Sequence, residues 1–390
     1  MSFTCDLCDG APLEQVYAAQ NSPRNLTVSL CSHCGLLQSL PRIDRGERKT
    51  ARISADADWG NLRYGKGFRA EANLATLKPF LNRNKQLRVL DVGANRGAFA
   101  LELKAAYPKA KVIGIEPDER VVGAWVGKTD FCWLNARLED TRLENEGFDL
   151  IYSCHTLEHL KSPRAALLAH RAALAPGGYL LIEVPNVALL SSNDIVEEFF
   201  IDKHLYHFSN RTLARLLTAC GFRAVAIGDP RDAVNITVVA VKADTILDTV
   251  AADPDEVRET AALISAYQAM RMTNLNALTS VARMIDRMAP RKVAVWGAGR
   301  LLNSLISNGG LKPNALAAVV DKHLIKYASE AHGIRLTPPE DLARVKPDVV
   351  VVMSRSFADE IRSEAQTRAP GCEVVAYSDL LAQAKAQAAA

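Results

Sequence analysis

The stretch "VLDVGANRG", residues 89–97, decides how the middle of this chain is expected to fold. A short apolar run ends near acidic Asp91 and turns through two glycines into a helical pattern, which is typical of a strand, turn and helix in an α/β sheet. The runs at 222–228 and 236–242 are separated by a short loop and predict an antiparallel pair at the end of the sheet. Four other apolar runs alternate with helical stretches and predict further parallel strands: 111–117 ("KVIGIEP"), 130–134 ("DFCWL"), 148–154 ("FDLIYSC") and 179–185 ("YLLIEVP").

The glycine turn indicates which ligand this sheet binds. Dinucleotide sites need a middle glycine so that the backbone can approach a pyrophosphate, but Asn95 and Arg96 occupy this region. The carboxylate of Asp91 would repel a phosphate, whereas it suits a ligand that carries an ammonium group and a sulfonium cation. These properties describe S-adenosylmethionine. Glu116, at the end of the second predicted strand, would then accept hydrogen bonds from both ribose hydroxyls.

The motifs of residues 87–242 resemble those of the class I S-adenosylmethionine-dependent methyltransferases. Four motifs carry the resemblance, in the expected order: "VLDVGANRG" (89–97), "IGIEPD" (113–118), "FDLIYSCHTLEHLKSP" (148–163) and "LAPGGYLLIEVPN" (174–186). The resemblance implies an α/β fold with a seven-stranded Rossmann-like core, with Leu138 and Glu139 near the adenine, and Cys154 and His155 near the methionine. The cofactor-binding residues that it implies are Asp91, Gly93, Ala94, Gly97, Glu116, Pro117, Leu138, Glu139, Cys154 and His155.

Four of the eight cysteines form two closely spaced pairs, "CDLC" (5–8) and "CSHC" (31–34). A two-residue spacer turns both thiolates of a pair toward one point, and two such pairs supply the ligands of a tetrahedral structural zinc site. A catalytic role of the metal is not expected because no ligand position is left open. The predicted zinc ligands are Cys5, Cys8, Cys31 and Cys34. The other cysteines are scattered and are expected to be small buried hydrophobes: Cys132, Cys154, Cys220 and Cys372.

The C-terminal part is expected to begin with a long helix and to continue as a second α/β unit. Asp253 and Pro254 form an N-cap and a first turn for a helix that runs to about Met288. "KVAVWGAGR" (292–300) then opens a second series of apolar runs. Because this turn has only two of the three fingerprint glycines, a structural unit that helps to hold the substrate is favoured over an NAD site. The predicted organisation is 1–45 (zinc-binding module), 46–245 (methyltransferase domain), 246–290 (helical linker) and 291–390 (second Rossmann-like domain).

The order of zinc module, methyltransferase core and C-terminal unit resembles the bacterial sugar C-methyltransferases over essentially the whole chain. "GAGR" (297–300) and "SFADEI" (356–361) are close to C-terminal segments of that family. The resemblance implies a nucleotide-linked keto-sugar as substrate and a histidine base after the fifth strand, a position that His204 occupies in "DKHLYHFS" (202–209). His159 matches a second polar residue near the sugar.

The same stretch departs from the family pattern beside the histidine. The family's glutamate is Lys203 here, which leaves Asp202 as the neighbouring acidic residue that would orient the imidazole. Methylation of a sugar oxygen, which needs only one base, is therefore an alternative. His204 and His207 are not expected to bind a metal because no carboxylate or cysteine cluster accompanies them in the sequence. His207 is expected to be a packed residue that leads into a helix.

The composition limits the partners that the chain is expected to have. Lys and Arg number 47 and Asp and Glu number 44, without a block of like charge, so nucleic acid is not expected to bind. No apolar run approaches the roughly 18 residues of a membrane span, and a cytoplasmic protein is expected. The oligomeric state is left open. Two other functions remain as alternatives: methylation of an RNA base, since a four-cysteine module also precedes some ribosomal RNA methyltransferases, and a cofactor-binding scaffold without turnover.

Overall fold

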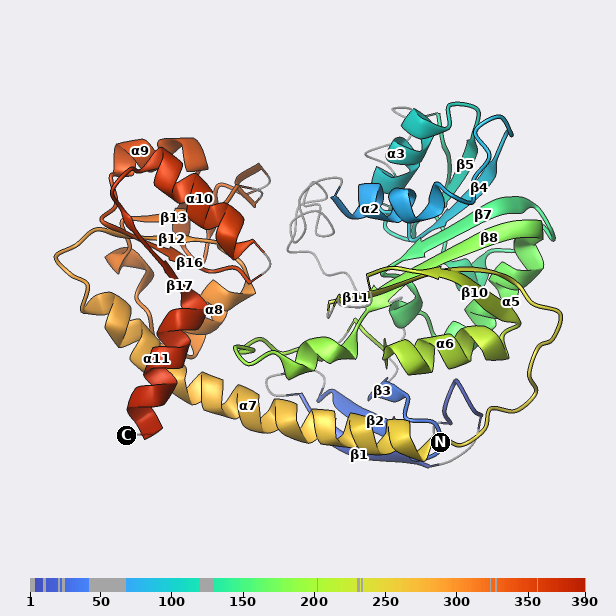
Figure 1. Ribbon diagram of the computed structural model, residues 1–390, viewed down its shortest axis with the longest axis horizontal. Coiled ribbons are helices and arrows are strands. Elements are labelled where there is room, and N and C mark those ends of the chain that lie inside the picture. The colour runs from blue at the N-terminus through green and yellow to red at the C-terminus, as the bar shows by residue number, and fades with distance from the viewer. Residues whose placement is uncertain are drawn as a thin grey trace. The chain divides into compact units, whose positions relative to one another are not determined.

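The computed structural model describes residues 4–9, 12–19, 22, 25–41, 68–119, 122, 130–201, 203–229, 232, 234–322, 324–326, 328–355 and 357–389. The chain forms two compact units, whose elements are labelled in Figure 1. The first unit comprises Met1–Leu190 and Phe199–Ile264. The second comprises Ser191–Glu198 and Ser265–Ala390.

The first unit is built on a seven-stranded sheet in the order β10-β11-β8-β7-β4-β5-β6. The predicted apolar runs form its parallel strands, and β11 pairs antiparallel with both β8 and β10. The expected α/β fold with a Rossmann-like core and a closing antiparallel pair is therefore confirmed. The strands are β4 (Arg88–Val92), β5 (Lys111–Ile115), β6 (Cys132–Leu134), β7 (Phe148–Cys154), β8 (Leu174–Pro185), β10 (Phe222–Ile227) and β11 (Asn235–Lys242).

Helices cover both faces of this sheet because successive residues of its central strands point to opposite sides. Val89 and Leu150 enter one buried apolar cluster together with residues of α2 and α3. Leu90 and Ile151 enter the other cluster, which contains residues of α5 and α6. The helices are α2 (Phe68–Leu77), α3 (Ala98–Ala106), α5 (Pro163–Ala173) and α6 (Asn210–Ala219).

A four-stranded antiparallel sheet in the order β1-β2-β3-β9 forms the N-terminal module. Its last strand comes from "DKHLYHFS", so a segment far along the chain completes the sheet. His207 lies buried in this strand with its Nε2 2.7 Å from Ser39 Oγ, and burial lowers the pKa of His207 to about 3. Its predicted packed position before a helix is confirmed, since Ser209 caps α6. The strands are β1 (Leu13–Ala18), β2 (Thr27–Cys31), β3 (Leu37–Leu40) and β9 (Tyr206–His207).

The second unit contains a six-stranded sheet in the order β14-β15-β13-β12-β16-β17. Its neighbouring strands are parallel except for β14 and β15, which confirms a second α/β sheet in the C-terminal part. The strands are β12 (Val293–Trp296), β13 (Ala318–Val320), β14 (Glu330–Ala331), β15 (Ile334–Thr337), β16 (Val349–Val352) and β17 (Glu373–Ala376). The helices are α8 (Arg300–Ser307), α9 (Leu342–Val345), α10 (Ala358–Arg368) and α11 (Tyr377–Ala389).

The predicted long helix is present as α7 (Pro254–Asp286), which begins in the first unit and ends in the second. Residues 191–198 also belong to the second unit, although they lie between segments of the first in the sequence. Arg355 binds Asp194 and Glu197, each at 2.8 Å, and Val196 is buried in the second unit's apolar core. Short 3-10 helices complete the described elements: η2 (Leu138–Asp140), η3 (Leu157–His159), η4 (Val187–Ser191), η5 (Pro313–Ala315), η6 (Leu324–Lys326) and η7 (Pro339–Asp341).

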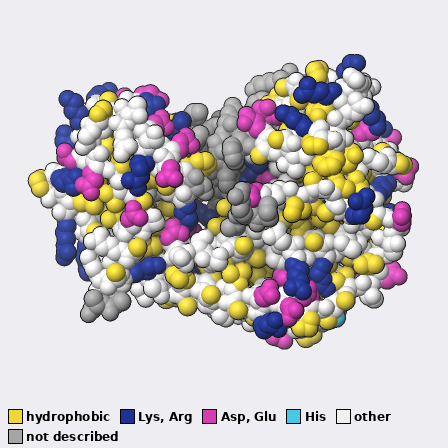
Figure 2. Space-filling view, viewed as in Figure 1, with side chains coloured by type: hydrophobic (Ala, Val, Ile, Leu, Met, Phe, Trp, Pro, Cys, Tyr) yellow, Lys and Arg dark blue, Asp and Glu magenta, His cyan; other side chains and the backbone are white. Residues whose placement is uncertain are grey.

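The surface carries mixed charge. On the face shown in Figure 2, Lys and Arg side chains lie among Asp and Glu side chains rather than in one broad basic area. Within the described ranges, no helix is both long and apolar enough to cross a membrane.

Candidate active site

The carboxyl ends of four parallel strands bring most of the predicted site residues to one edge of the sheet. Asp91 lies in β4, Glu116 directly follows β5, Cys154 ends β7, and Glu183 lies near the end of β8. The first strand of the seven-stranded sheet in the sequence, β4, lies between β5 and β7, so the strand order reverses there. Ligands of open α/β sheets bind at such a reversal.

The glycine turn after β4 is shaped by the chain's own packing. Gly93 has a φ of 73°, and a Cβ at this position would collide with the hydroxyl oxygen of Thr156. That hydroxyl donates a hydrogen bond to Val92 O at 3.0 Å. Gly97 has a φ of 70° and stands at the N-terminus of α3, with buried Ala94 three residues earlier. The turn is held to the next strand by backbone hydrogen bonds, since the N–H groups of Gly93 and Ala94 both donate to Ile115 O at 2.9 and 3.0 Å.

Glu116 is held at the turn by two backbone amides. Its Oε2 accepts the N–H of Asn95 at 2.9 Å, and its Oε1 accepts the N–H of Asp118 at 2.9 Å, so Pro117 lies inside this loop. Burial raises the pKa of Glu116, while the two amides act in the opposite direction. Each carboxylate oxygen keeps a second lone pair, and a pair of ribose hydroxyls fits these acceptors.

The predicted adenine end contains the 3-10 helix η2. Leu138 is buried there, and Glu139 Oε1 accepts the backbone N–H of Lys161 at 3.2 Å. The structure thus places a buried apolar side chain at Leu138 directly before a carboxylate that is fixed by a backbone N–H.

Asp91 is buried, with 2% of its surface exposed. Burial, and secondly the charge of Glu116, raise the pKa of Asp91 to about 8. A buried carboxyl group that is neutral near pH 7 becomes a stable carboxylate when a cation arrives beside it. The ammonium and sulfonium groups of S-adenosylmethionine are such cations, so the residues at this edge fit that cofactor.

We expect the affinity for S-adenosylmethionine to rise with pH until about pH 8 and then to level off. The raised pKa of Asp91 means that a cationic ligand must displace a proton below that pH, which weakens binding by up to about tenfold for each pH unit. Titration calorimetry at pH 6, 7 and 8, in buffers of different ionisation enthalpy, measures both the affinity and the released proton. Asp91→Asn is the matched control and should show no proton release from this site. Equal affinities at pH 6 and 8 with no proton release in the wild type would contradict the expectation.

The neighbouring strand end carries a charged group that the sequence analysis did not single out. Burial alone would raise the pKa of Glu183, but His155 and Arg69 outweigh it and hold that pKa at about 2. Arg69 Nε lies 2.8 Å from Glu183 Oε1, and His155 Nε2 lies 3.3 Å from it. Cys154 Sγ donates to the same oxygen at 3.3 Å. An acidic residue inside the apolar run "YLLIEVP" was the available signal, because a buried charge needs a partner.

His159 and His204 come together from separate segments, η3 and the loop before β9. Their ring centroids are 4.8 Å apart in an edge-to-face arrangement. Both rings lie near Glu158, a carboxylate with 1% of its surface exposed that the sequence analysis missed. Its Oε1 is 3.6 Å from His159 Nε2 and 4.0 Å from His204 Nε2. The structure therefore brings to His204 a carboxylate that the sequence pattern around it does not show, whereas Asp202, the acidic residue considered there, lies outside the described residues.

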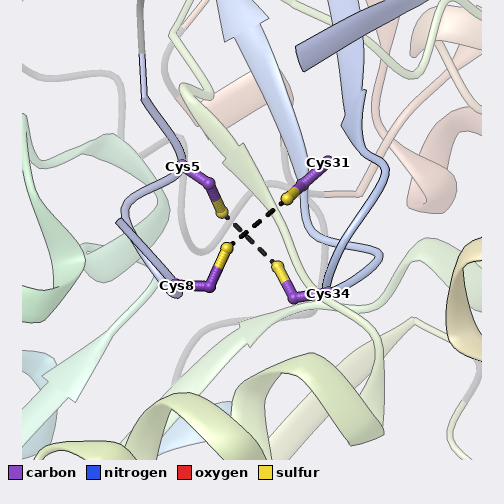
Figure 3. A group of neighbouring side chains, drawn as sticks. All are labelled: Cys5, Cys8, Cys31 and Cys34. Atoms are coloured by element: carbon purple, nitrogen blue, oxygen red, sulfur yellow. Dashed lines mark hydrogen bonds between the residues drawn. The ribbon is translucent and has the colours of Figure 1, made fainter. Parts of the chain in front are cut away.

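The four N-terminal cysteines converge on one point, as Figure 3 shows. The Sγ atoms of Cys5 and Cys34 are 3.4 Å apart, and those of Cys8 and Cys31 are 3.6 Å apart. A tetrahedral zinc ion with bonds of about 2.3 Å separates its sulfur ligands by roughly 3.8 Å, whereas a disulfide needs about 2.05 Å. The cluster therefore has the spacing of a metal site rather than of two disulfides.

The remaining cysteines follow their expected burial only in part. Cys220 is buried, and Cys154 and Cys372 are partly buried. Cys132 is exposed, which corrects the expectation of a buried residue. It lies in β6, a strand at the edge of the sheet, where alternate side chains face solvent.

Comparison with known proteins identifies the central part of the chain. Residues 66–227 match the family model described as "Methyltransferase domain". These residues form a class I S-adenosylmethionine-dependent methyltransferase domain. A second model, described as "C2185-like, N-terminal", matches residues 289–369, beyond the methyltransferase domain.

Two curated relatives of this chain are named tRNA U34 carboxymethyltransferases. The protein from Methylococcus capsulatus is 32% identical over 187 residues, which are 45% of this chain and 54% of the relative. The protein from Chromohalobacter salexigens is 28% identical over 217 residues, which are 52% of this chain and 62% of the relative. The chain thus spans about half the length of these relatives.

A solved structure of a putative S-adenosylmethionine-dependent methyltransferase from Listeria monocytogenes is also similar. It covers 45% of this chain and 100% of its own, with 19% identity and a TM-score of 0.38.

Proposed function

We propose that the protein methylates a sugar, most specifically a carbon of a nucleotide-linked keto-sugar, with His204 as the base. The observation that carries the proposal is the pairing of His159 and His204, whose ring centroids are 4.8 Å apart. His155 Nε2 lies 3.3 Å from Glu183 Oε1, at the edge proposed to hold the cofactor. Its Nδ1 lies 3.6 Å from Glu158 Oε1, so this histidine connects the proposed cofactor edge with the histidine pair.

The proposed reaction needs few protein groups besides these histidines. A keto group acidifies the hydrogen on the adjacent carbon, and a neutral imidazole of His204 takes that proton, leaving an enolate. Histidine suits this task because its pKa lies near neutrality. His159 lies beside His204, and a positive charge on its ring would stabilise the developing enolate. S-adenosylmethionine, when bound, supplies an electrophilic methyl group to the carbon nucleophile.

We also propose that Cys5, Cys8, Cys31 and Cys34 bind one structural zinc ion. The spacing of their sulfurs and the absence of an open ligand position support this role. The zinc would organise the N-terminal sheet, to which the segment after His204 adds strand β9.

Methylation of tRNA is the second candidate, and it is favoured by the names of the two relatives above. Carboxymethylation is a different transfer from methylation, and the relatives match only part of this chain. The near balance of 47 basic and 44 acidic residues and the mixed charge in Figure 2 give a long nucleic acid little attraction.

One experiment separates these acceptors. The full-length protein, with zinc supplied, is incubated with S-adenosylmethionine and with three acceptors in turn: nucleotide-linked keto-sugars, their reduced hydroxyl counterparts, and tRNA lacking the U34 modification. We expect a mass gain of one methyl group in a keto-sugar, placed on carbon by NMR. A methyl group found on a sugar oxygen would show that the protein is a sugar O-methyltransferase rather than a C-methyltransferase. Modified tRNA, with unchanged sugars, would overturn the proposal.

A further inference from the structure

We infer that Glu158 is a positioning residue that holds His159 as an imidazolium and orients His204 as the neutral base. The inference rests on the proposed function, because it assigns His204 the task of taking a proton. It also explains how the site works with Lys203 where the sugar C-methyltransferase pattern has glutamate. The required carboxylate comes from η3, directly before His159 in the sequence.

The first argument is burial. Only 1% of Glu158 is exposed, and a carboxylate in such a place is stable only with positive charge beside it. The groups that face it come from three segments: His155 at the end of β7, His159 in the same short helix, and His204 in the loop before β9. Beyond His155 lie Glu183 and Arg69, which pair with each other at 2.8 Å. The three imidazoles each lie within 4.0 Å of Glu158 Oε1, and each becomes a cation when it is protonated.

The second argument is the placement of protons on His159. Its Nδ1 lies 2.6 Å from the backbone oxygen of Lys203, and a carbonyl oxygen can only accept, so Nδ1 carries a proton. Nε2 then faces Glu158 Oε1 at 3.6 Å. A lone pair on Nε2 would point at a carboxylate, whereas a second proton on Nε2 gives an imidazolium and an ion pair. The contacts favour the charged ring.

The third argument is the backbone that joins the two segments. The N–H of Leu205 donates to Glu158 O at 2.8 Å, directly after His204 in the chain. This bond, together with that from His159 to Lys203 O, fixes the loop of His204 against η3. When His204 takes up a proton, its Nε2, 4.0 Å from Glu158 Oε1, becomes a cation facing a carboxylate. Carboxylates stabilise newly formed imidazolium in this way in other acid–base sites.

His155 needs a separate assignment because it also touches Glu158. The Nδ2 group of Asn235 donates to Asp232, which leaves its Oδ1 to accept the N–H of His155 Nε2 at 3.0 Å. That ring is therefore anchored on the cofactor side, between Glu183 and Glu158. A cation held by Glu158, His159 and His204 is a competing arrangement, since their ligand atoms lie within 4.8 Å of one another. Protonation is preferred because Oε1 lies within 4.0 Å of a ring nitrogen of all three histidines, so each ring can form an ion pair with it when protonated.

The test is a comparison of Glu158→Gln, Glu158→Asp and wild type in the full-length, zinc-supplied protein. Loss of the charge should lower the apparent pKa values of both imidazoles by about 1–3 units, because an opposite charge at this distance is removed. Both limbs of the pH profile of kcat should then move to lower pH. Glu158→Asp should keep the limbs near their wild-type positions, and Glu146→Gln, an exposed carboxylate away from the site, should change nothing. A lower kcat with an unmoved profile would contradict the inference.

A second measurement does not depend on the substrate. Histidine ring resonances of the protein with S-adenosylhomocysteine are titrated by NMR, with His159→Gln used for assignment. In the wild type, His159 should titrate above the ordinary value of about 6.5 by roughly 1–3 units. A value at or below 6.5 would overturn the inference even if every Glu158 variant failed to fold. So would a stoichiometric second divalent ion that disappears in Glu158→Gln.

The two proposals fail in different ways. If no sugar is methylated but the NMR titration shows the raised His159 value, the proposed function fails and the ion pair stands. If a keto-sugar is methylated but His159 titrates normally, the function stands and the role of Glu158 fails.

Discussion

Cys31→Ser is expected to remove the bound zinc and to unfold the N-terminal sheet. Structural zinc sites of four ligands contribute apparent binding free energies of about 10–16 kcal/mol in small domains, and whole proteins are stable by only about 5–15 kcal/mol. If one lost thiolate releases the zinc, the stabilising free energy that is lost is therefore as large as the whole free energy of unfolding. Cys31 is completely buried at the end of β2, where a serine hydroxyl would be a poor metal ligand without another partner.

The damage should reach the methyltransferase domain because the cysteine turns are packed against it. Arg164, at the start of α5, donates its backbone N–H to Asp6 Oδ2 at 2.9 Å and its side chain to Leu7 O at 3.1 Å. Arg215 in α6 donates to Cys34 O at 3.2 Å. Gly35 packs so closely against Glu256 of α7 that a side chain at position 35 would collide with it. The two cysteine turns thus contact three helices, α5, α6 and α7.

The measurement is metal content by mass spectrometry together with thermal unfolding and methyl transfer. We expect one zinc per chain in the wild type, none in Cys31→Ser, and loss of activity along with the N-terminal sheet. Cys132→Ser is the matched control, because Cys132 is an exposed thiol in β6 and should leave zinc, stability and activity unchanged. Zinc retained in Cys31→Ser, or absent from the wild type, would refute the proposed metal site.

The two sheets were predictable because buried parallel strands leave continuous apolar runs, as in "FDLIYSC" and "YLLIEVP". The start of α6 was predictable for a similar reason, since Ser209 is a strong N-cap residue before an amphipathic stretch. These features depend on residues that are adjacent in the sequence, so the sequence alone is enough to predict them.

Features made by distant segments were not predictable in the same way. Strand β9 has only two residues, Tyr206–His207, and pairs with β3, so no periodicity announces it. Residues 191–198 belong to the second unit through Arg355, and the sequence offers no sign of that pairing. Glu158 in "TLEHL" carries no local signal of its burial, and the sequence does not show that Leu205, directly after His204, bonds to its backbone oxygen.

His204→Ala is expected to reduce methyl transfer by about 10²–10⁴-fold, the contribution of a positioned general base. Affinity for S-adenosylmethionine should stay unchanged, because the residues proposed to hold it, such as Asp91 and Glu116, lie at the strand ends and not in the loop of His204. His204→Gln separates shape from proton transfer: its amide fills similar space but cannot take the proton. Both variants should therefore be equally slow. His332→Ala, a histidine of the second unit that contacts Ala298 O at 3.1 Å, is the control.

The same variant decides whether the proton comes from carbon. When S-adenosylhomocysteine replaces the methyl donor in deuterium oxide, a keto-sugar bound beside His204 should exchange its acidic carbon-bound hydrogen for deuterium, because His204 removes the proton and solvent returns it. NMR of the recovered sugar measures the exchange, which should stop in His204→Ala and His204→Gln. If the sugar exchanges at the wild-type rate in His204→Ala, another group is the base. If the wild type methylates without any exchange, the acceptor is an oxygen, and His204 takes its proton from a hydroxyl.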